Sequence, residues 1–466
     1  MLGKKLAALT STRALFLLDI ATMAAAWPFV LVLAGFVPPE GAAEWLAVLL
    51  YPAANLALLY ALGLYRRDVI VEARKSMSRV PLAAGLGATI AAVTGILSSR
   101  MLGPMHDGVR LFVAAVLCFL ASGIAARTVF AALRHNGVFR RRLLVVGAGK
   151  RAWDLAWMLR KEGPTLNYEI AFVHEPALGE VDARLADGSA GRIVPASAHG
   201  VLGAARSFGA DQIVVAPDER RGMGLESLLQ CKVAGFPVKQ YLSFVEKEIR
   251  RVDIKRMELG WLLYSDGFYF GIIDRVLKRS LDLAVSSVLL LAFAPFLLAA
   301  IVAIKVDDGG PVFYGQERVT RNGRSFQISK LRTMRSDAEA QGAVWAASKD
   351  SRITRVGAFL RRTRIDEMPQ LFNVLRGDMS LVGPRPERPA FVRMLAEQIP
   401  LYHERHVVKA GLTGWAQINY PYGASTNDAR SKLSYDLYYV KNFSVLFDLL
   451  IIVQTLRVVL WPGGVR

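Results

Sequence analysis

The sequence has only two cysteines in 466 residues, Cys118 and Cys231, and they lie far apart. No C-x-x-C spacing occurs, so a disulfide scaffold and a zinc ribbon are both excluded. Charged residues are also scarce, at 21% of the chain, and internal repeats and low-complexity tracts are absent. A disordered chain is excluded as well, because 53% of the residues are hydrophobic and the mean hydropathy is +0.31.

Acidic residues are fewer than basic ones, 39 against 58, which gives a net charge of +19. A surface this basic favours an anionic partner: nucleic acid, lipid headgroups or phosphorylated substrates. Composition does not choose among the three. The length suggests roughly three units, taking about 150 residues for each.

Four long apolar stretches fill the first 140 residues, near residues 14–36, 45–64, 80–99 and 109–132. Each is long enough, or nearly so, to cross a hydrocarbon core of about 30 Å. Basic residues flank both ends of the set, so the positive-inside rule places both ends in the cytoplasm. We predict a four-helix transmembrane bundle over 1–140. A cleaved signal peptide fits less well, because three further apolar runs follow the first.

Residues 141–243 have the pattern of an α/β domain. Strand-like runs at 143–146, 168–173, 192–194 and 212–216 alternate with helical stretches. This alternation predicts a doubly wound parallel sheet, and thus a Rossmann-like domain, followed by a linker over 244–274.

The glycine-rich turn at 147–152 follows the first of these strands. Such a turn lets the backbone approach a pyrophosphate at a helix N-terminus, and Glu175 is the best acidic candidate after the second strand. Only G-x-G-x-x-A is present, so nucleotide binding and a structural or regulatory function both stay open.

A fifth apolar run, residues 281–304, carries basic residues on both sides, Lys278 and Arg279 before it and Lys305 after it. A helix that crossed the bilayer would place one basic cluster outside. A helix broken at Pro295 that returns to the side it entered satisfies both flanks. We therefore predict a re-entrant helix over 279–305, with a kinked spanning helix as the alternative. The last apolar stretch, 443–461, contains Asp448 and Arg457 and predicts a helix on the membrane surface or packed on the domain.

Cationic side chains cluster with two carboxylates between residues 311 and 419. Lys330 and Arg332 alternate in a strand pattern and would form an anion clamp on one face. Asp366 and Glu367 precede a helix that Pro369 would begin, and adjacent helical residues point about 100° apart, so they cannot share one role. The alternatives are that Asp366 only caps a helix and that the two cations only solvate a strand edge.

Arg385 lies between Pro384 and Pro386, in a backbone that proline makes rigid. Such rigidity suits a guanidinium that must meet a phosphate, although a surface turn is the alternative. His403 and His406 are three residues apart. A metal site is conceivable there, but without a nearby third ligand a solvated or capped helical face is favoured.

Ordered motifs make the last third of the chain recognisable. They are Lys278-Arg279 with Asp282, Gly310-Pro311-Val312-Phe313, Gln316-Glu317-Arg318-Val319, Lys330-Leu331-Arg332-Thr333-Met334, D-E-M-P-Q-L-F-N-V-L-R-G-D-M-S-L-V-G-P-R-P from Asp366, and G-L-T-G-W-A-Q-I-N from Gly411. This series closely resembles the bacterial sugar transferases that act as polyprenyl-phosphate hexose-1-phosphate transferases. With the preceding membrane and Rossmann-like segments, the chain is similar to the long-form members that initiate exopolysaccharide or O-antigen synthesis.

The resemblance implies a catalytic domain over 275–466, seated on the bacterial inner membrane by the re-entrant helix and facing the cytoplasm, with a C-terminal interfacial helix. It implies transfer of hexose 1-phosphate from a UDP-hexose, glucose or galactose, to undecaprenyl phosphate, giving undecaprenyl-diphosphate-hexose and UMP. A homodimer, membrane lipids as partners and no nucleic acid are further expectations.

The resemblance also implies functions for particular residues. Asp366 would be the nucleophile that forms a phospho-sugar aspartate, and Glu367 its partner at a Mg²⁺ (or Mn²⁺) site. The groups expected to bind phosphate or substrate are Lys330, Arg332, Arg385, Arg318 and Gln417. Lys278, Arg279 and Asp282 would stand at the membrane entry, and Pro295 at the kink. The sequence departs from the usual pattern at Ala294, Gly315, Arg364 and Ala410.

Two functions of other classes stay open. The first is a membrane-tethered nucleotide-sugar oxidoreductase or dehydratase that uses the 147–152 turn, and the second is a non-catalytic scaffold. The sequence does not identify the hexose.

Overall fold

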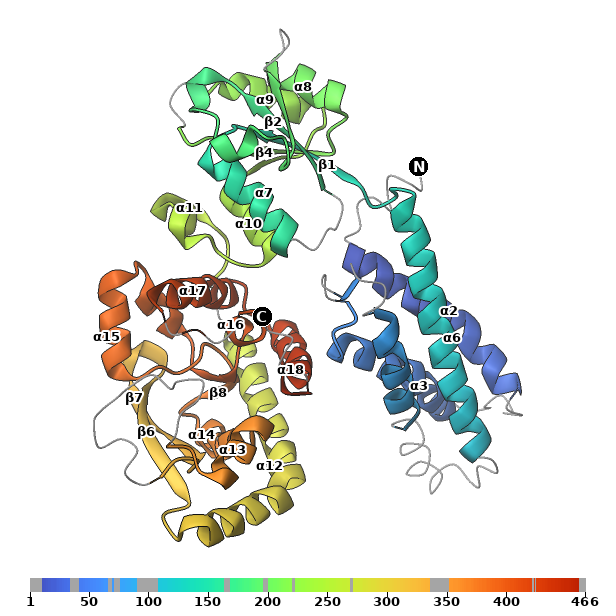
Figure 1. Ribbon diagram of the computed structural model, residues 1–466, viewed down its shortest axis with the longest axis vertical. Helices are drawn as coiled ribbons and strands as arrows, with labels where there is room; N and C mark the ends of the chain where they lie inside the picture. Colours follow the sequence, from blue (N-terminus) through green and yellow to red (C-terminus); the bar gives the residue numbers. More distant parts are fainter. Residues whose placement is uncertain are drawn as a thin grey trace. The chain divides into compact units, whose positions relative to one another are not determined.

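The computed structural model describes residues 11–33, 42–65, 69–70, 76–89, 108–162, 168–195, 200–219, 223–268, 271–335, 352–420, 423 and 425–460. The chain forms two compact units, Met1–Arg250 and Arg251–Arg466. Figure 1 shows the first unit in blue to green and the second in yellow-green to red.

Long apolar helices begin the first unit: α2 (Ser11–Leu33), α3 (Ala42–Ala61), a helix over 76–89 and α6 (Gly108–His135). In the described part of the chain, three helical segments are long and apolar enough to cross a membrane: Thr12–Val30, Phe112–His135 and Ile272–Asp307. Half of the predicted span at 80–99, residues 90–99, lies outside the described residues. The four-helix bundle therefore stays a prediction, whereas helices long and apolar enough to cross a membrane are present.

A buried ion pair joins α2 to α6. Arg127 Nη1 lies 2.9 Å from Asp19 Oδ1, and the Tyr65 hydroxyl donates to Asp19 Oδ2 at 2.8 Å. Charged groups among apolar helices need such partners, because an isolated charge there is strongly disfavoured. Nearby, the rings of Trp27 and Phe119 stack at 5.6 Å between centroids.

A five-stranded parallel sheet forms the rest of the first unit. Its strands are β1 (Arg141–Val146), β2 (Tyr168–His174), β3 (Arg192–Pro195), β4 (Gln212–Val215) and β5 (Val238–Gln240), in the order β3-β2-β1-β4-β5. The connecting helices are α7 (Lys150–Glu162), α8 (Gly200–Phe208), α9 (Leu225–Val233) and, after β5, α10 (Tyr241–Ile249), with 3-10 turns η1 (Pro176–Leu178) and η2 (Ala183–Leu185). The predicted parallel sheet is confirmed. Because α10 buries Phe244 and Val245, the unit continues past the predicted boundary at 243 to Arg250.

The second unit is a mixed α/β structure with small sheets. Its strands are β6 (Phe313–Val319) and β7 (Ser325–Leu331), an antiparallel hairpin, and β8 (Ser380–Val382) and β9 (Gly411–Thr413), a parallel pair. Its helices are α11 (Leu259–Tyr264), α12 (Ile272–Asp308), α13 (Arg355–Thr363), α14 (Gln370–Arg376), α15 (Pro389–Gln398), α16 (Trp415–Asn419), α17 (Thr426–Lys441) and α18 (Val445–Leu460), with 3-10 turns η3 (Ile254–Arg256), η4 (Arg321–Gly323), η5 (Ile365–Glu367) and η6 (Tyr402–Val407).

The segment predicted as a linker packs on this second unit. Val252 is buried with Val319, Val392 and Tyr402, and Trp261 packs at the edge of the same cluster. Apolar burial therefore fixes the start of the segment to the domain that follows it.

Helix α12 is bent but not interrupted. It runs for 37 residues with Pro295 inside it, and Figure 1 shows its two halves pointing in different directions. Proline bends a helix because it lacks an N–H and its ring meets the carbonyl four residues before. Its outward apolar side chains are exposed: Val288, Leu291, Phe296, Leu298, Val302 and Val306.

Both halves of α12 pack on the second unit. In the first half, Asp282 accepts hydrogen bonds from the Ser380 hydroxyl and the Leu381 N–H. In the second half, Ala300 and Ile304 are buried with Leu331 and Leu360. Both halves of the helix are therefore attached to the rest of the second unit.

The last helix, α18, packs on the same unit. Its Asp448 is fully buried and accepts from Lys278 Nζ at 2.6 Å and from the Tyr439 hydroxyl at 2.8 Å. The acidic residue that interrupts this apolar stretch is thus an anchor between α18 and α12.

Candidate active site

The strand β7 and the helix α14 fix the position of Lys330. The amide of Asn373 on α14 accepts from the Ser329 N–H at 3.0 Å and donates to the Gln327 carbonyl at 2.8 Å. The Asn373 side chain is thus hydrogen-bonded to the backbone of β7 at Ser329, the residue before Lys330. Because Asn373 is 1% exposed, water does not compete with these bonds.

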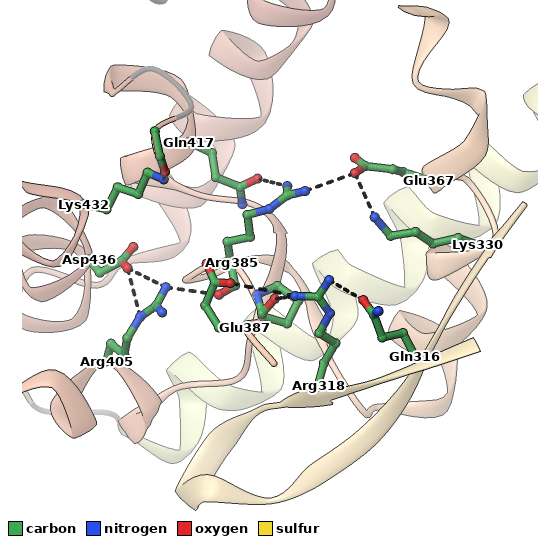
Figure 2. Close-up of polar contacts among 12 residues, drawn as sticks. Gln316, Arg318, Lys330, Glu367, Arg385, Glu387, Arg405, Gln417, Lys432 and Asp436 are labelled. Carbon is green, nitrogen blue, oxygen red and sulfur yellow. Dashed lines mark hydrogen bonds and ion pairs between the residues drawn. The ribbon is translucent and has the colours of Figure 1, made fainter. Parts of the chain in front are cut away.

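Three cationic side chains contact the carboxylate of Glu367, the last residue of η5. Lys330 Nζ lies 3.3 Å and Arg385 Nη2 3.4 Å from Glu367 Oε1, and Arg364 Nη1 lies 3.7 Å from Oε2. Figure 2 shows the contacts of Lys330 and Arg385 with this carboxylate. Arg364 has a left-handed backbone, with φ of 61°, and ends α13, so the chain turns sharply just before the two carboxylates.

Asp366, one residue earlier, is buried and only 8% exposed. In contrast to Glu367, its Oδ1 atom is buried without a hydrogen-bond partner among the described residues. A buried carboxylate oxygen without a partner is unfavourable unless a ligand or a reaction uses it.

The environments of the two carboxylates separate their pKa values. Burial, reinforced by the charge of Glu367, raises the pKa of Asp366 to about 6, although Lys330, Arg364 and Arg361 oppose the rise. Burial also acts to raise the pKa of Glu367, but Lys330, Arg385 and Arg364 outweigh it and bring the pKa to about 2. Glu367 is therefore a fixed anion, and Asp366 is the group that titrates near neutrality.

Arg385 joins this cluster to α16. Its Nη1 donates to Gln417 Oε1 at 3.0 Å while Nη2 contacts Glu367. The structure thus brings together four of the predicted site residues by direct contacts: Lys330, Glu367, Arg385 and Gln417 (Figure 2).

Arg318 makes a different set of contacts. Arg318 donates to the Pro386 carbonyl at 3.1 Å and to Gln316 Oε1 at 2.6 Å. Arg332 follows the end of β7, is buried, and lies so close to Gly310 that a Cβ there would meet the guanidinium. Glycine at position 310 therefore makes room for the arginine.

The residues predicted at the membrane entry anchor α12. Lys278 donates to the Val382 carbonyl as well as to Asp448, and Arg279 donates to the carbonyls of Val374 and Leu375 at 2.6 Å each. Those carbonyls end α14, where a cation also offsets the helix dipole. Together with Asp282, these residues attach the first half of α12 to the domain.

Asp366 and Glu367 are the carboxylates that would hold the predicted divalent metal, and both oxygens of Glu367 already contact cationic side chains. No group of three or more His, Cys, Asp or Glu side chains that could hold a metal occurs in the described part of the chain. Mg²⁺ is usually held by one or two carboxylates, with waters and substrate phosphates completing its shell. Asp366, with its unpartnered Oδ1, and Glu367 supply that donor set.

The two histidines do not share one environment. His403 is exposed, whereas His406 is 8% exposed and burial lowers its pKa to about 3. The prediction of a solvated or capped helical face is thus wrong for His406, because η6 turns it into the domain.

The glycine-rich turn binds a carboxylate of the chain itself. Gly147 has φ of 109°, and the N–H groups of Lys150 and Arg151, at the start of α7, donate to Asp218 at 2.6 and 2.9 Å. Glu175 follows β2 as expected. The anion position of the helix N-terminus is therefore taken by Asp218, after β4, which the sequence pattern did not indicate.

Comparisons with known proteins agree with this site. The family model described as "Bacterial sugar transferase" matches residues 273–462. A UDP-glucose:undecaprenyl-phosphate glucose-1-phosphate transferase of Klebsiella pneumoniae is 30% identical over 359 residues, which are 74% of each chain. The chain belongs to the bacterial sugar transferase family.

Other sugar transferases match shorter stretches. A UDP-N-acetylgalactosamine-undecaprenyl-phosphate N-acetylgalactosaminephosphotransferase of Aeromonas hydrophila is 41% identical over 252 residues, 53% of this chain and 58% of that protein. The "Exopolysaccharide production protein PSS" of Rhizobium leguminosarum bv. phaseoli is 43% identical over 189 residues, 39% of this chain and 94% of that protein. The family match contains the whole carboxylate and cation cluster.

Sequence reasoning missed several residues of this sugar transferase site. Asn373 lies within the D-E-M-P-Q-L-F-N motif but carries no charge to attract notice. Arg405 and Asp436 form a buried ion pair, with Nη2 of Arg405 2.8 Å from Asp436 Oδ2. One indication of this pair is visible in the sequence: Asp436 is the single acidic residue within the apolar and aromatic stretch 435–440.

Proposed function

We propose that the protein transfers a hexose 1-phosphate from a UDP-hexose to undecaprenyl phosphate, giving undecaprenyl-diphosphate-hexose and UMP. The proposal rests on the family membership and on one observation: a buried carboxylate, Asp366, with a free oxygen beside a second carboxylate that three cations surround. The named relatives act on UDP-glucose or UDP-N-acetylgalactosamine and on undecaprenyl phosphate.

The reaction would proceed in two displacements at Asp366. In the first, a carboxylate oxygen bonds to the sugar-bearing phosphorus of the UDP-hexose, and the bond to the UMP oxygen breaks. In the second, an oxygen of undecaprenyl phosphate bonds to that phosphorus, and the aspartate leaves as a carboxylate. A covalent intermediate lets a soluble and a lipid-bound anion use the same site in turn.

The cations would offset the negative charge that two phosphates bring. Lys330 and Arg385 both contact Glu367 Oε1, so the two cations lie close together beside the carboxylate pair. Asp366 and Glu367 would hold Mg²⁺, which would stabilise charge on the leaving UMP. Such donors are worth most where water is excluded, and Asp366 is buried.

We also propose that α12 is re-entrant and that the second unit lies on the cytoplasmic face of the inner membrane. Because both halves of α12 pack on one unit, a helix that spans the bilayer would have to carry that unit through it. The exposed apolar residues of α12 would face lipid, and four membrane helices over 1–140 would complete the membrane part.

Cysteine labelling tests this topology. Ile272 and Val306, at the two ends of α12, are 76% and 81% exposed. In a background without Cys118 and Cys231, Ile272→Cys and Val306→Cys should both react from the cytoplasmic side only. Labelling of the two positions from opposite sides would establish a spanning helix.

The function is tested with radiolabelled donors. The purified full-length protein, undecaprenyl phosphate and Mg²⁺ should convert UDP-glucose, UDP-galactose or UDP-N-acetylgalactosamine into labelled lipid and UMP, and the productive donor identifies the sugar. No labelled lipid from any of the three would contradict the proposal. A homodimer, predicted from the resemblance, is tested by the mass of the detergent-solubilised protein.

The same preparation separates the two alternatives. An oxidoreductase would copurify with NAD and would lose turnover on Gly147 substitution but keep it in Asp366→Asn. A scaffold would support polysaccharide production in cells that carry Asp366→Asn. Loss of both lipid labelling and cellular polysaccharide in Asp366→Asn is expected for the transferase.

A further inference from the structure

The loop that carries Arg385 has an unusual set of backbone contacts. Pro384 and Pro386 lack an N–H, so the backbone cannot donate a hydrogen bond at either of these two positions. Its carbonyls are held instead. Pro384 O accepts from the Gly411 N–H at 2.9 Å, and Glu387 O accepts from the Val319 N–H at 3.0 Å.

Two arginine side chains complete the series. Arg405 Nη2 donates to the Arg385 carbonyl at 3.1 Å, and Arg318 Nη1 donates to the Pro386 carbonyl at 3.1 Å. Four consecutive carbonyls, 384 to 387, are thus held by donors from β9, η6 and β6. Figure 2 shows Arg405 and Arg318 beside this loop, while the Arg385 guanidinium extends to Gln417 and Glu367.

Arg405 is itself fixed by buried partners. It is 4% exposed, its Nε donates to Asp436 Oδ2 at 3.1 Å, and its Nη1 donates to the Tyr402 hydroxyl at 2.8 Å. Buried ion pairs contribute little stability compared with apolar side chains of the same size, since both charges lose their hydration. The fork of the guanidinium lets this one side chain reach Asp436, Tyr402 and the Arg385 carbonyl at the same time.

We propose that Arg405, held by Asp436, is a positioning residue that aims Arg385 at the substrate phosphates, with Arg318 holding the other side of the loop. This inference rests on the proposed function of Arg385. It assigns Arg318 to the loop in place of the substrate contact predicted from the sequence. Neither Arg405 nor Arg318 needs to touch the substrate.

A double-mutant cycle tests the proposal. Arg405→Lys keeps a positive charge beside Asp436 but cannot reproduce the fork, so kcat/KM should fall by about 10-fold or more. In an Arg385→Ala background the same change should reduce kcat/KM by less than about 3-fold, because its target is already absent. Losses that multiply in the two backgrounds would overturn the proposal, as would full activity in Arg405→Lys.

Two controls accompany the cycle. Arg393→Lys, an exposed arginine on α15, should leave kcat/KM unchanged in both backgrounds. Asp436→Asn weakens the ion pair that holds the Arg405 guanidinium. Its effect on kcat/KM is measured in the same two backgrounds, and it replaces Arg405→Lys if that variant does not fold.

Hydrogen exchange gives a readout that is independent of turnover. The amide protons of Gly411 and Val319, which donate to the Pro384 and Glu387 carbonyls, should exchange faster in Arg405→Lys than in the wild type, and those of α14 should not. Unchanged exchange at Gly411 and Val319 overturns the positioning assignment even if no UDP-hexose is a substrate. An inactive wild type with faster exchange in Arg405→Lys would instead leave the loop contact standing and defeat only the proposed function.

Discussion

Asp366 and Glu367 are neighbours on one turn, yet the cations lie on Glu367 and the free oxygen lies on Asp366. The first carboxylate therefore has a raised pKa, about 6, and the second a lowered one, about 2. Two carboxylates with separated pKa values can take different functions in one reaction. Asp366, the proposed nucleophile, is the carboxylate whose charge is least compensated.

Asp366→Asn should abolish lipid labelling, with a loss of about 10³-fold or more, because an amide oxygen cannot form the phospho-aspartate. The same variant should melt at a higher temperature at pH 7.5. The pKa of Asp366 in the folded state, about 6, lies above the unfolded value of 3.8. Ionisation of this carboxyl therefore lowers the free energy of unfolding as the pH rises above 3.8, by up to about 3 kcal/mol above pH 6. Glu397→Gln, an exposed carboxylate on α15, is the control. A lower melting temperature for Asp366→Asn would contradict this reading of its burial.

The pH dependence of kcat/KM should show one ionisation. Activity should be low at acid pH, rise as Asp366 loses its proton, and level off above, while Glu367 stays ionised throughout. The pKa of about 6 applies to the metal-free carboxyl, and a bound divalent cation would lower the midpoint. Arg364→Gln removes a cation that lowers the pKa of Asp366, so the midpoint should move to higher pH. An unmoved midpoint would show that a group other than Asp366 titrates.

Lys278→Met should destabilise the protein strongly. It leaves Asp448, which is fully buried, without its cation, and breaking a buried pair typically reduces stability by about 3–5 kcal/mol. Thermal unfolding in detergent measures the loss, and Lys305→Met, an exposed lysine on the same helix, is the control. The double variant Lys278→Met with Asp448→Leu should recover part of the stability. If the double variant is no better than the single one, the pair is not the anchor.

Asp218→Ala should weaken the start of α7 without affecting transfer. Two N–H groups lose their acceptor, a change worth about 1 kcal/mol at a helix N-terminus. Faster amide exchange at Lys150 and Arg151 is the expected sign, with unchanged lipid labelling. Because the carboxylate fills the anion position, NAD⁺ should not raise the melting temperature of the wild type. A clear rise would reopen the oxidoreductase alternative.

Much of the fold could be predicted because its signals are local. The alternating pattern from Arg141 predicted the parallel sheet, and runs of apolar residues predicted membrane helices at 14–36 and 109–132. The end of the first unit at Arg250 could not be predicted from the sequence, because it depends on where Phe244 and Val245 are buried. The prediction for His406 failed for the same reason, since solvent exposure depends on packing between distant segments.

The sequence by itself determined the family and the chemistry available to it: the order of motifs, the paired carboxylates at 366 and 367, the arginine between two prolines and the apolar run with Pro295. Each of these features depends only on residues that are neighbours along the chain. Only the tertiary structure decided which carboxylate the cations neutralise, and that Arg405, twenty residues after Arg385, holds its carbonyl. It also decided that Asp218 fills the glycine-rich turn. Electrostatic interactions depend on distance and burial, and a pattern of residues along the chain fixes neither.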